Sequence, residues 1–497
     1  MGSIPTMSIA FEESRAPYVL AMDIGSTASR GGLYDASGCP IKSSKQRVSH
    51  AFNAGEGVST IDPDQVVAEI RTVMAGIIEQ AEEHCVKDKI TGIALDSFAS
   101  SLILVDAEGN ALTPCYTYAD AQSAPFVEQL RTEIAEDEYH ARTGVRLHTS
   151  YHPARLLWLK NAHPELFAKA AHVMTIGEYV YFKIAGILGM STSIAAWSGI
   201  LNAHTGELDL PILEHIGVDP ALFSGIFDPD QPATNAKLEE AEWAFLEQLP
   251  WFHAIPDGWP SNIGPGAVDS KTVAVAAATS GAMRVILPGV PAQIPSGLWC
   301  YRVSRNQCIV GGALNDVGRA VSWLETTIIQ PENLGEILAG PPMDGVPSVL
   351  PFFSGERSIG WASSARASIT NLQSSSGPAE IWRGVFESLA LSYQRVWRHM
   401  ELAGATPERV IASGRVATDH PEFLTMLCDA LTTPVLPLEM KRATLRGTAL
   451  IALEVLDAGG DRALPPFGAE IQPRYSEHYV QAREVFDGLY EKLVELT

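Results

Sequence analysis

The sequence lacks the features that mark several protein classes. It has six cysteines, none in a CxxC pair or at zinc-finger spacing, which excludes a small disulfide scaffold and favours a reduced, cytoplasmic setting. No apolar run reaches the roughly 18 residues of a membrane-spanning helix. Lysine and arginine number 35 against 58 for aspartate and glutamate, so the net charge of −23 argues against binding to nucleic acid or an anionic membrane.

Familiar nucleotide and hydrolase motifs are also missing. The sequence contains no GxxxxGK[ST] loop, no GxGxxG turn, no HExxH pair and no GxSxG elbow, and its 13 histidines form no ligand cluster. A nucleotide would therefore need another phosphate cradle. With 46% hydrophobic and 19% charged residues, the 497-residue chain has the composition of a globular protein of two or three domains.

Strands and helices alternate along the first half of the chain. An apolar strand over 18–23 leads through a short polar turn into a return strand over 30–34, and Asp62 is a suitable N-cap for a helix through residue 78. Residues 1–17 are expected to form an N-terminal extension without regular structure. The elements that follow predict α/β layers: strands over 89–96 and 102–106, and helices over 151–162 and 175–186.

The second half restarts the same pattern. A strand over 273–278, the turn Thr279-Ser280-Gly281 and a strand over 283–287 repeat the opening unit about 250 residues later. Prolines and glycines are frequent over 256–266, and a boundary between two similarly built halves is expected near 260–270. Later predicted elements are helices over 379–402, 421–431 and 475–496 and a strand over 409–412.

The two short polar turns carry the candidate chemistry. In the first, Asp23 at a strand end can hold hydrated Mg²⁺, and Gly25 lets the backbone approach a phosphate. Ser26 and Thr27 can donate hydrogen bonds to the same phosphate. Each turn alone is also what a plain hairpin needs. Two such turns facing each other across a cleft would clamp a polyphosphate from both sides.

Segments along nearly the whole chain, about residues 18–495, resemble those of the FGGY carbohydrate kinases of the actin-like ATPase superfamily, and they occur in the family's order. In the N-terminal half these segments are AMDIGSTASRGGLYD, ITGIALDSFASSLILVDAEGNALTPCYTYAD, RTGVRLHTSYHPARLLWLK, TIGEYVYFKIAG and PDGWPSNIGPGAV. In the C-terminal half they are AAATSGAMRV, VGGALNDVG, PFFSGERSIGW, IWRGVFESLALSY, VIASGRVATDHPEFLTMLCDAL and LRGTALIAL.

The resemblance implies an α/β fold of two actin-like, ribonuclease H-like ATPase domains with a catalytic cleft between them. It places the N-terminal domain at 18–264 and the C-terminal domain at 265–497. It also implies ATP and Mg²⁺ as cofactors and a small sugar or sugar acid as the partner. The oligomeric state is left open between a monomer and a homodimer.

The resemblance also assigns roles to particular residues. Asp257 would accept the proton of the attacking hydroxyl, as phosphoryl transfer requires, and Asp23 would hold Mg²⁺. The nucleotide would contact Gly25, Ser26, Thr27, Thr279, Ser280, Gly281, Ser413 and Gly414. The sugar would contact Asp120, Ser97, Phe98 and Ser100. In isolation, Asp257 is equally typical of a plain Asp-Gly turn, and Asp120 of a solvated loop acid.

Four positions depart from the family pattern, one of them Asn371, which replaces a glycine of the C-terminal signature. Pro256 stands where the family has a glycine before the catalytic aspartate, and proline fixes φ and removes an N–H group. Gln122 replaces an arginine, which removes a cation from the substrate site or its support. Arg415 replaces the second glycine of the adenosine turn, where it would crowd the base or stack on it.

The favoured function is an ATP-dependent carbohydrate kinase. The segments VGGALNDVG and GERSIGW resemble the gluconate-kinase branch most, and kinases of ketopentoses such as xylulose are the alternative, because the loss of arginine at 122 does not favour an anionic substrate. A catalytically silent sensor of sugar or nucleotide on the same fold is the alternative of another class. A third alternative, an ATPase without a sugar site, is disfavoured because it gives the sugar-loop segments no role.

Overall fold

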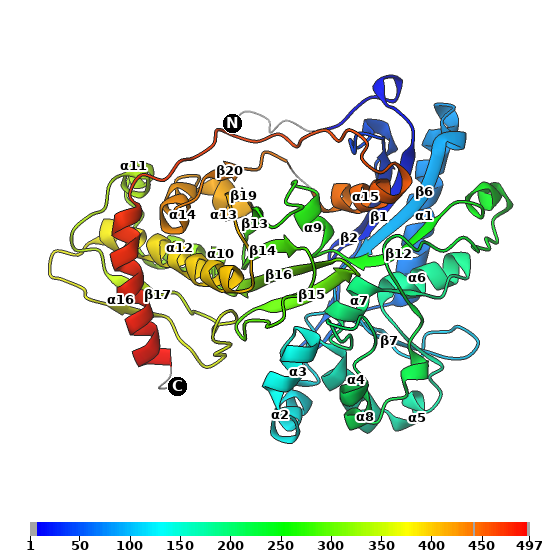
Figure 1. Ribbon diagram of the computed structural model, residues 1–497, viewed down its shortest axis with the longest axis horizontal. Helices are drawn as coiled ribbons and strands as arrows, with labels where there is room; N and C mark the ends of the chain where they lie inside the picture. The colour runs from blue at the N-terminus through cyan, green and yellow to red at the C-terminus, as the bar shows by residue number, and fades with distance from the viewer. Residues whose placement is uncertain (1–6, 441–442, 495–497) are drawn as a thin grey trace.

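Two mixed β-sheets form the centre of the molecule (Figure 1). The structure is a computed structural model that describes residues 7–440 and 443–494. The N-terminal sheet has the strand order β3-β2-β1-β6-β12, in which β1, β2 and β3 are antiparallel and β1, β6 and β12 are parallel. Its strands are β1 (Tyr18–Ile24), β2 (Ala28–Tyr34), β3 (Gln46–Ser49), β6 (Ile90–Ser97) and β12 (Trp251–Pro256).

The C-terminal sheet repeats this plan with one extra edge strand. Its order is β15-β16-β14-β13-β19-β20, with β16, β14 and β13 antiparallel and β13, β19 and β20 parallel. The prediction of two similarly built halves is confirmed. The strands are β13 (Thr272–Ala277), β14 (Gly281–Leu287), β15 (Trp299–Ser304), β16 (Gln307–Leu314), β19 (Arg409–Ser413) and β20 (Val435–Pro437).

Helices cover the sheets and build a lobe beside the N-terminal sheet (Figure 1). Those around the sheets are α1 (Pro63–Glu83), α6 (Ile176–Ala185), α9 (Pro260–Ile263), α10 (Gly318–Thr327), α12 (Pro378–Leu402), α13 (Arg415–Asp419), α14 (Phe423–Leu431), α15 (Ala443–Leu456) and α16 (Ser476–Val494). The lobe includes α2 (Ala124–Glu133), α3 (Glu136–Thr143), α4 (His152–Ala162), α7 (Thr192–Trp197) and α8 (Leu210–Ile216). The helices predicted from periodicity are confirmed to within a few residues at their ends.

Alternating side chains decide what covers each face of the sheets. In β1, Leu20 and Met22 belong to the core that α1 and α6 close, whereas Val19 and Ala21 face the opposite side. The predicted N-cap of α1, Asp62, accepts a hydrogen bond from a backbone N–H of the first turn. The outer face of the C-terminal sheet packs on α10, α12 and α14 in a second large core.

Helix α15 belongs to the C-terminal half in sequence but packs on the N-terminal sheet. Figure 1 shows it beside β1 and β2, away from the other late helices. Its Ala449 and Leu453 bury against Val19 and Ala21 of β1. The segment expected to form the C-terminal domain, 265–497, therefore contributes a helix to the core of the N-terminal sheet.

Helix α15 crosses the short helix α9, which follows β12, with little space between the backbones. A Cβ atom on Gly264 would lie 1.8 Å from the carbonyl oxygen of Ala443, and one on Gly447 would lie 2.0 Å from that of Pro260. Only glycine permits this approach. The crossing joins the two halves directly behind the end of β12.

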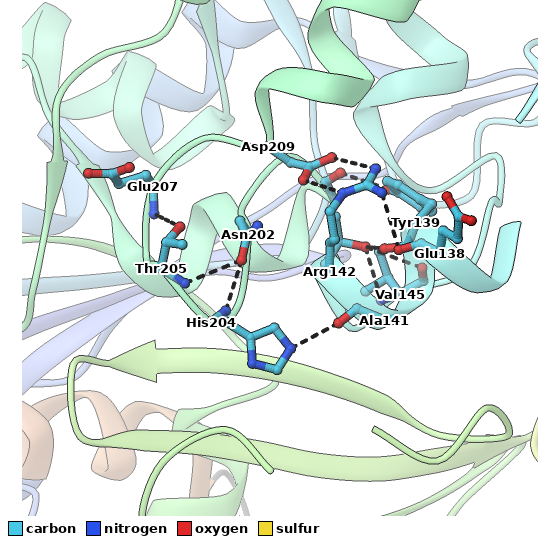
Figure 2. Close-up of polar contacts among 12 residues, drawn as sticks. Glu138, Tyr139, Ala141, Arg142, Val145, Asn202, His204, Thr205, Glu207 and Asp209 are labelled. Atoms are coloured by element: carbon cyan, nitrogen blue, oxygen red, sulfur yellow. Dashed lines mark hydrogen bonds and ion pairs between the residues drawn. The ribbon is translucent and has the colours of Figure 1, made fainter. Parts of the chain in front are cut away.

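The lobe is bound to the C-terminal sheet by polar contacts. Figure 2 shows Arg142 of α3 donating from Nε and Nη2 to the two carboxylate oxygens of buried Asp209, at 2.9 and 3.2 Å. His204 Nε2 donates to the Ala141 carbonyl at 2.9 Å. Arg302 of β15 donates to the carbonyl of His204, also at 2.9 Å. The first two contacts hold the lobe together, and the Arg302 bond joins it to the edge strand of the C-terminal sheet.

The N-terminal segment is more ordered than expected. Residues 1–6 lie outside the described residues. From Ser8 onward the segment packs on the N-terminal half: Ile9 exchanges backbone hydrogen bonds with Pro40 and Lys42, and the buried Phe11 ring stacks on His84 at 4.0 Å. The expectation of an extension without regular structure is therefore wrong for this part, because Ile9 and Phe11 pack against the N-terminal half.

No helix among the described residues is both long and apolar enough to cross a membrane.

Candidate functional site

Three carboxylates lie at or just beyond the carboxyl ends of adjacent strands in the N-terminal sheet. The strands β1, β6 and β12 are parallel neighbours, in which Asp23 pairs with Asp96, and Pro256, immediately before Asp257, pairs with Ser97. Side chains at the ends of neighbouring parallel strands meet at one edge of the sheet, where open α/β sheets bind ligands. The pKa values of these carboxyls respond to one another, so the three groups share one site.

Asp23 and Asp96 are neighbouring buried carboxyls whose pKa values depend on each other. Burial, and then the charge of Asp23, raises the pKa of Asp96 well above its ordinary value. Burial also raises the pKa of Asp23, but the Arg30 guanidinium, 3.2 Å from Asp23 Oδ2, opposes this shift. The Thr448 hydroxyl of α15 donates a hydrogen bond to Asp96 Oδ2, and Asp96 Oδ1 is buried without a hydrogen-bond partner among the described residues.

This pair of carboxyls suits a divalent cation whose other ligands are waters and phosphate oxygens. Within 7–440 and 443–494, no group of three or more His, Cys, Asp or Glu side chains is arranged to hold a metal alone. Mg²⁺ usually takes one or two carboxylates and completes its shell with waters and phosphate oxygens. Two adjacent buried carboxyls, one of them with an oxygen that has no hydrogen-bond partner among the described residues, fit this pattern, because a cation would neutralise their charge.

Asp257 is a buried carboxyl whose pKa is shifted toward neutrality. Burial, reinforced by the charge of Asp23, raises the pKa of Asp257 to about 6. The Arg284 guanidinium and the backbone N–H groups of Ala99 and Gly258 act in the opposite direction. A carboxylate with a pKa just below neutral is ionised at pH 7 and can still take up a proton, which is what a general base needs.

The first predicted phosphate turn is a tight hairpin tip between β1 and β2. Ser26 and Thr27 are exposed there, and the hairpin is closed by a 3.0 Å hydrogen bond from the Gly25 N–H to the carbonyl of Ala28. The ring of buried His50 supports the turn from below: its Nε2 donates to the Gly25 carbonyl and its Nδ1 contacts a Glu69 carboxylate oxygen, both at 2.8 Å.

An aromatic wall lies beside the hairpin tip and Asp257. Phe98, at the end of β6, packs edge-on against Phe52 and Tyr118, with ring centroids 5.1 and 6.4 Å away. Burial raises the pKa of Tyr118, the charge of Asp257 adds to this shift, and the Ser26 side chain opposes it. Tyr118 is therefore near both the hairpin tip and Asp257.

Asp120, predicted to contact the sugar, uses its carboxylate within its own loop. It is 1% exposed and accepts hydrogen bonds from the Ser59 N–H at 2.9 Å, the Gln122 N–H at 3.2 Å and Gln122 Nε2 at 3.0 Å. Buried Arg155 donates to the Asp120 carbonyl from beneath. Gln122, where the family has arginine, therefore closes the loop on Asp120.

Of the other predicted sugar residues, Ser97 and Ser100 point into the protein. A Cβ atom on Gly177 of α6 would lie 3.2 Å from the buried Ser97 Oγ, which has no hydrogen-bond partner among the described residues. Ser100 has a positive φ of 58° and donates its hydroxyl to the Trp197 carbonyl at 2.6 Å. Their side chains lie behind the aromatic wall.

The second predicted phosphate turn joins β13 to β14. Thr279 and Ser280 are exposed at its tip, and the N–H of Gly318, the first residue of α10, donates to the Ala278 carbonyl at 2.8 Å. Gly281 follows the tip, where a Cβ atom would lie 2.3 Å from the Tyr393 hydroxyl. The turn therefore needs glycine at this position and is supported by α10.

A cavity of about 170 Å³ opens beside the second turn. It is lined by Thr279 of the turn, by α10 residues and by Val416 and His420 at α13. Gly414, immediately before α13, has φ of 106°, and a Cβ atom there would lie 2.4 Å from the Ala277 carbonyl oxygen. This glycine lets the turn after β19 lie against the end of β13, next to the cavity.

Two departures from the family pattern have a local explanation. Arg415 at the cavity rim points outward, where its Nε is 2.8 Å from an Asp419 carboxylate oxygen. Pro256 ends the edge strand β12, where proline is tolerated, and the next N–H, that of Asp257, still donates to the Ser97 carbonyl at 2.9 Å. Neither departure displaces the backbone at Asp257 or closes the cavity.

The sequence interpretation missed Asp96, His50, Tyr118 and Arg284 at this site. Asp96 ends a buried strand with an acid, as Asp23 does, and that shared pattern was the available signal. The other three reach the site through pairings between distant segments. No local pattern marked them.

The two mixed sheets form an α/β fold that this chain shares with solved sugar kinase structures. Models of the N-terminal and C-terminal domains of the FGGY family of carbohydrate kinases match residues 18–264 and 283–454. The chain belongs to the FGGY family of carbohydrate kinases, which are ATP-dependent phosphotransferases acting on sugar hydroxyls. The predicted fold class and enzyme class are confirmed.

The relatives include kinases of two substrates. A gluconokinase of Bacillus licheniformis is 24% identical over 454 residues, covering 88% of this chain and 87% of its own, and a xylulose kinase of Staphylococcus xylosus is 20% identical over 444 residues, covering 88% and 90%. The gluconate kinase structure from Lactobacillus acidophilus matches with a TM-score of 0.86 at 23% identity, covering 96% of this chain and 98% of its own. This structural likeness shows the shared fold.

Proposed function

We propose that the cleft transfers the γ-phosphoryl group of MgATP to a hydroxyl of a sugar acid, with gluconate as the first candidate. The Asp257 carboxylate takes the hydroxyl proton while the hydroxyl oxygen bonds to the γ-phosphorus. The bond from that phosphorus to the β–γ bridging oxygen breaks, and ADP leaves. The observation that carries the proposal is the position of Asp257 beside Asp23 and Asp96, at the ends of three adjacent strands.

The metal and the nucleotide occupy the two hairpin tips in this proposal. Asp23, with Asp96 beside it, would hold Mg²⁺, whose charge would offset that of the transferring phosphate. The backbone of Gly25 and the hydroxyls of Ser26 and Thr27 contact that phosphate. The second turn, Thr279-Ser280-Gly281, holds the other phosphates, and Ser413 and Gly414 border the adenosine, for which the 170 Å³ cavity is the proposed site.

The acceptor binds along the aromatic wall in front of Asp257. Tyr118, which is 44% exposed, offers its ring and hydroxyl to the acceptor, and Phe98, which is 1% exposed, supports that ring from behind. We assign the loop of Asp120 to the acceptor hydroxyls, with Ser97 and Ser100 fixing the wall from behind. An acceptor in this position would place one hydroxyl between Asp257 and the first hairpin tip.

A ketopentose such as xylulose is the second candidate acceptor. Two observations favour it: xylulose kinases are among the relatives, and Gln122 brings no positive charge to the Asp120 loop. The gluconokinases, at 24% identity, favour the sugar acid.

A competition experiment tests the choice. The enzyme, MgATP, and equal concentrations of gluconate and xylulose are mixed, and the phosphorylated products are identified by mass spectrometry and ³¹P NMR. We expect phosphogluconate as the main product. Phosphoxylulose alone would move the assignment to the second candidate, and release of phosphate without any phosphorylated sugar would contradict both.

A further inference from the structure

Arg284 is a cation on the inner face of the C-terminal sheet. Along β14, Met283, Val285 and Leu287 point into the outer core, while Ile286 joins a cluster with residues of the N-terminal half. Successive strand residues point to opposite faces. Arg284 therefore shares the face of Ile286, which is the face turned toward the N-terminal half.

The strands on either side leave room for this side chain. In the ladders, Arg284 pairs with Ala274 of β13 and with Gly311 of β16. The nearest aromatic ring is that of Trp299, whose centroid is 5.9 Å from the guanidinium carbon. No carboxylate among the described residues lies within 4.0 Å of its nitrogens, although the side chain is partly buried. A partly buried arginine without a carboxylate partner is unusual, since desolvating a charge costs free energy.

Arg284 and Asp257 face the same space from opposite halves. A Cβ atom on Gly258 would lie 3.0 Å from the Trp197 ring, and that ring stacks on Tyr301 at 3.8 Å. Tyr301 in turn lies 4.9 Å from the Trp299 ring beside Arg284. This series of ring contacts leads from Asp257 to Arg284. In agreement, the charge of each residue shifts the pKa of the other.

The position of Arg284 along its strand separates it from the phosphate turn. It lies three residues after Gly281, which corresponds to about 10 Å at the rise of an extended strand. Thr279 and Ser280 at the tip are farther still. The cation is therefore placed opposite the base, where the acceptor binds, rather than at the hairpin that holds phosphates in the proposed function.

A second arginine makes the same side of the cleft positive. Arg357, in the GERSIGW segment, acts on the pKa of Tyr301 together with Arg284, and also on those of His148 and Tyr151 in the lobe. Its Nε is buried and has no hydrogen-bond partner among the described residues. Two arginines without carboxylate partners converge here in a chain whose net charge is −23. This local excess of positive charge favours an anion.

We propose that Arg284 binds the carboxylate of a sugar-acid acceptor and thereby selects sugar acids over neutral sugars. This inference rests on the proposed phosphoryl transfer at Asp257 and adds the residue that determines its substrate class. A guanidinium can form two parallel hydrogen bonds with a carboxylate, which fixes the acceptor's orientation as well as its affinity. A neutral ketopentose has no carboxylate that could accept these two hydrogen bonds.

The test compares an acid and a neutral acceptor in matched variants. Arg284→Gln and the control Arg305→Gln, an exposed arginine at the β15–β16 turn, are assayed for kcat and KM with gluconate, xylulose and MgATP. In Arg284→Gln we expect kcat/KM for gluconate to fall by about 10- to 100-fold, mainly through KM, the range for a hydrogen bond to a charged group. At a pH above the acid limb set by Asp257, we expect the value for xylulose and the KM for MgATP to change by less than about threefold.

Each other outcome contradicts the proposal in a distinct way. Equal losses with both acceptors would make Arg284 a positioning residue for Asp257, and a higher KM for MgATP with every acceptor would place it on the γ-phosphate. A wild-type enzyme that phosphorylates xylulose but not gluconate would overturn the carboxylate assignment while phosphoryl transfer stands. If no acceptor is phosphorylated, the proposed function fails. Calorimetric titration of gluconate into wild type and Arg284→Gln then tests the role of Arg284 by itself. Equal affinity in the two proteins, or no binding to either, overturns the inference.

Discussion

The two sheets have the same strand topology, but different types of residue stand at the ends of their parallel strands. In the N-terminal sheet, acids stand at or just beyond the ends of the three parallel strands: Asp23, Asp96 and Asp257. In the C-terminal sheet, the corresponding strands β13, β19 and β20 end in Ala277, Ser413 and Pro437. The same topology thus offers an acidic edge on one side and a small, neutral edge on the other.

This difference indicates that the two halves have different roles in the reaction. An acidic edge suits a cation and proton transfer, whereas a neutral edge of small residues suits close approach of a nucleotide to the backbone. Changes in the N-terminal edge should therefore act on the chemical step and on Mg²⁺. Changes in the C-terminal edge should act on nucleotide affinity.

The largest effect is expected from Asp257→Asn. The amide keeps the shape but cannot accept the hydroxyl proton, so kcat should fall by roughly 10³-fold or more, while the affinity for MgATP stays within about threefold. Steady-state kinetics and nucleotide titration on the same samples measure both. The matched control is Asp88→Asn, at an exposed position remote from the site, and near-normal turnover in Asp257→Asn would remove the base assignment.

Asp23→Ala should come next and act on metal use. Without this carboxylate, the Mg²⁺ concentration needed for half-maximal activity should rise by about tenfold or more. Titrating Mg²⁺ at fixed ATP measures it. An unchanged Mg²⁺ requirement would show that the metal does not sit at the first hairpin.

Gly414→Ala should act on the C-terminal edge. The alanine would have to hold φ near 106° and place its Cβ 2.4 Å from the Ala277 carbonyl, so we expect the KM for MgATP to rise about tenfold or the fold to lose about 1–3 kcal/mol. Gly459→Ala is the matched control, since its φ of 71° is strained but no atom lies within 4 Å of the added Cβ. Equal effects in both variants would attribute the change to backbone strain alone.

The smallest effects are shifts of the pH profile. Because Asp257 must be ionised to accept a proton and has a pKa of about 6, kcat/KM should decline as the pH falls through 6. Removing the Asp23 charge in Asp23→Asn lowers the pKa of Asp257 and should move this acid limb to lower pH. Removing the opposing cation in Arg284→Gln should move it to higher pH. Shifts in the same direction for both variants would contradict this electrostatic scheme.

Much of the fold could be predicted because its signals are local. The two hairpins, the N-cap Asp62 and the long helices follow from apolar periodicity and turn residues in short windows. Asp257 was found by resemblance, since an Asp-Gly pair alone is typical of any turn. These predictions concern residues whose roles depend on their own neighbours in sequence.

The rest depends on contacts between distant segments. Asp96 meets Asp23 only when β1 and β6 pair across about 70 residues, and Thr448 reaches Asp96 only because α15 returns to the first sheet. Arg284 faces Asp257 through the packing of one half on the other. Periodicity carries no information about such pairings, so the sequence could not indicate them.

The most direct test of the central claim is acceptor-dependent ADP release. Wild-type enzyme with MgATP is measured with gluconate, with xylulose and with no acceptor, at pH 7.5 and at pH 5.5. We predict rapid ADP release only with an acceptor, and a lower kcat/KM at the lower pH. ADP release at the same rate without an acceptor, or no release with either sugar while MgATP still binds, would contradict the assignment of Asp257 and its neighbouring carboxyls as the site of phosphoryl transfer.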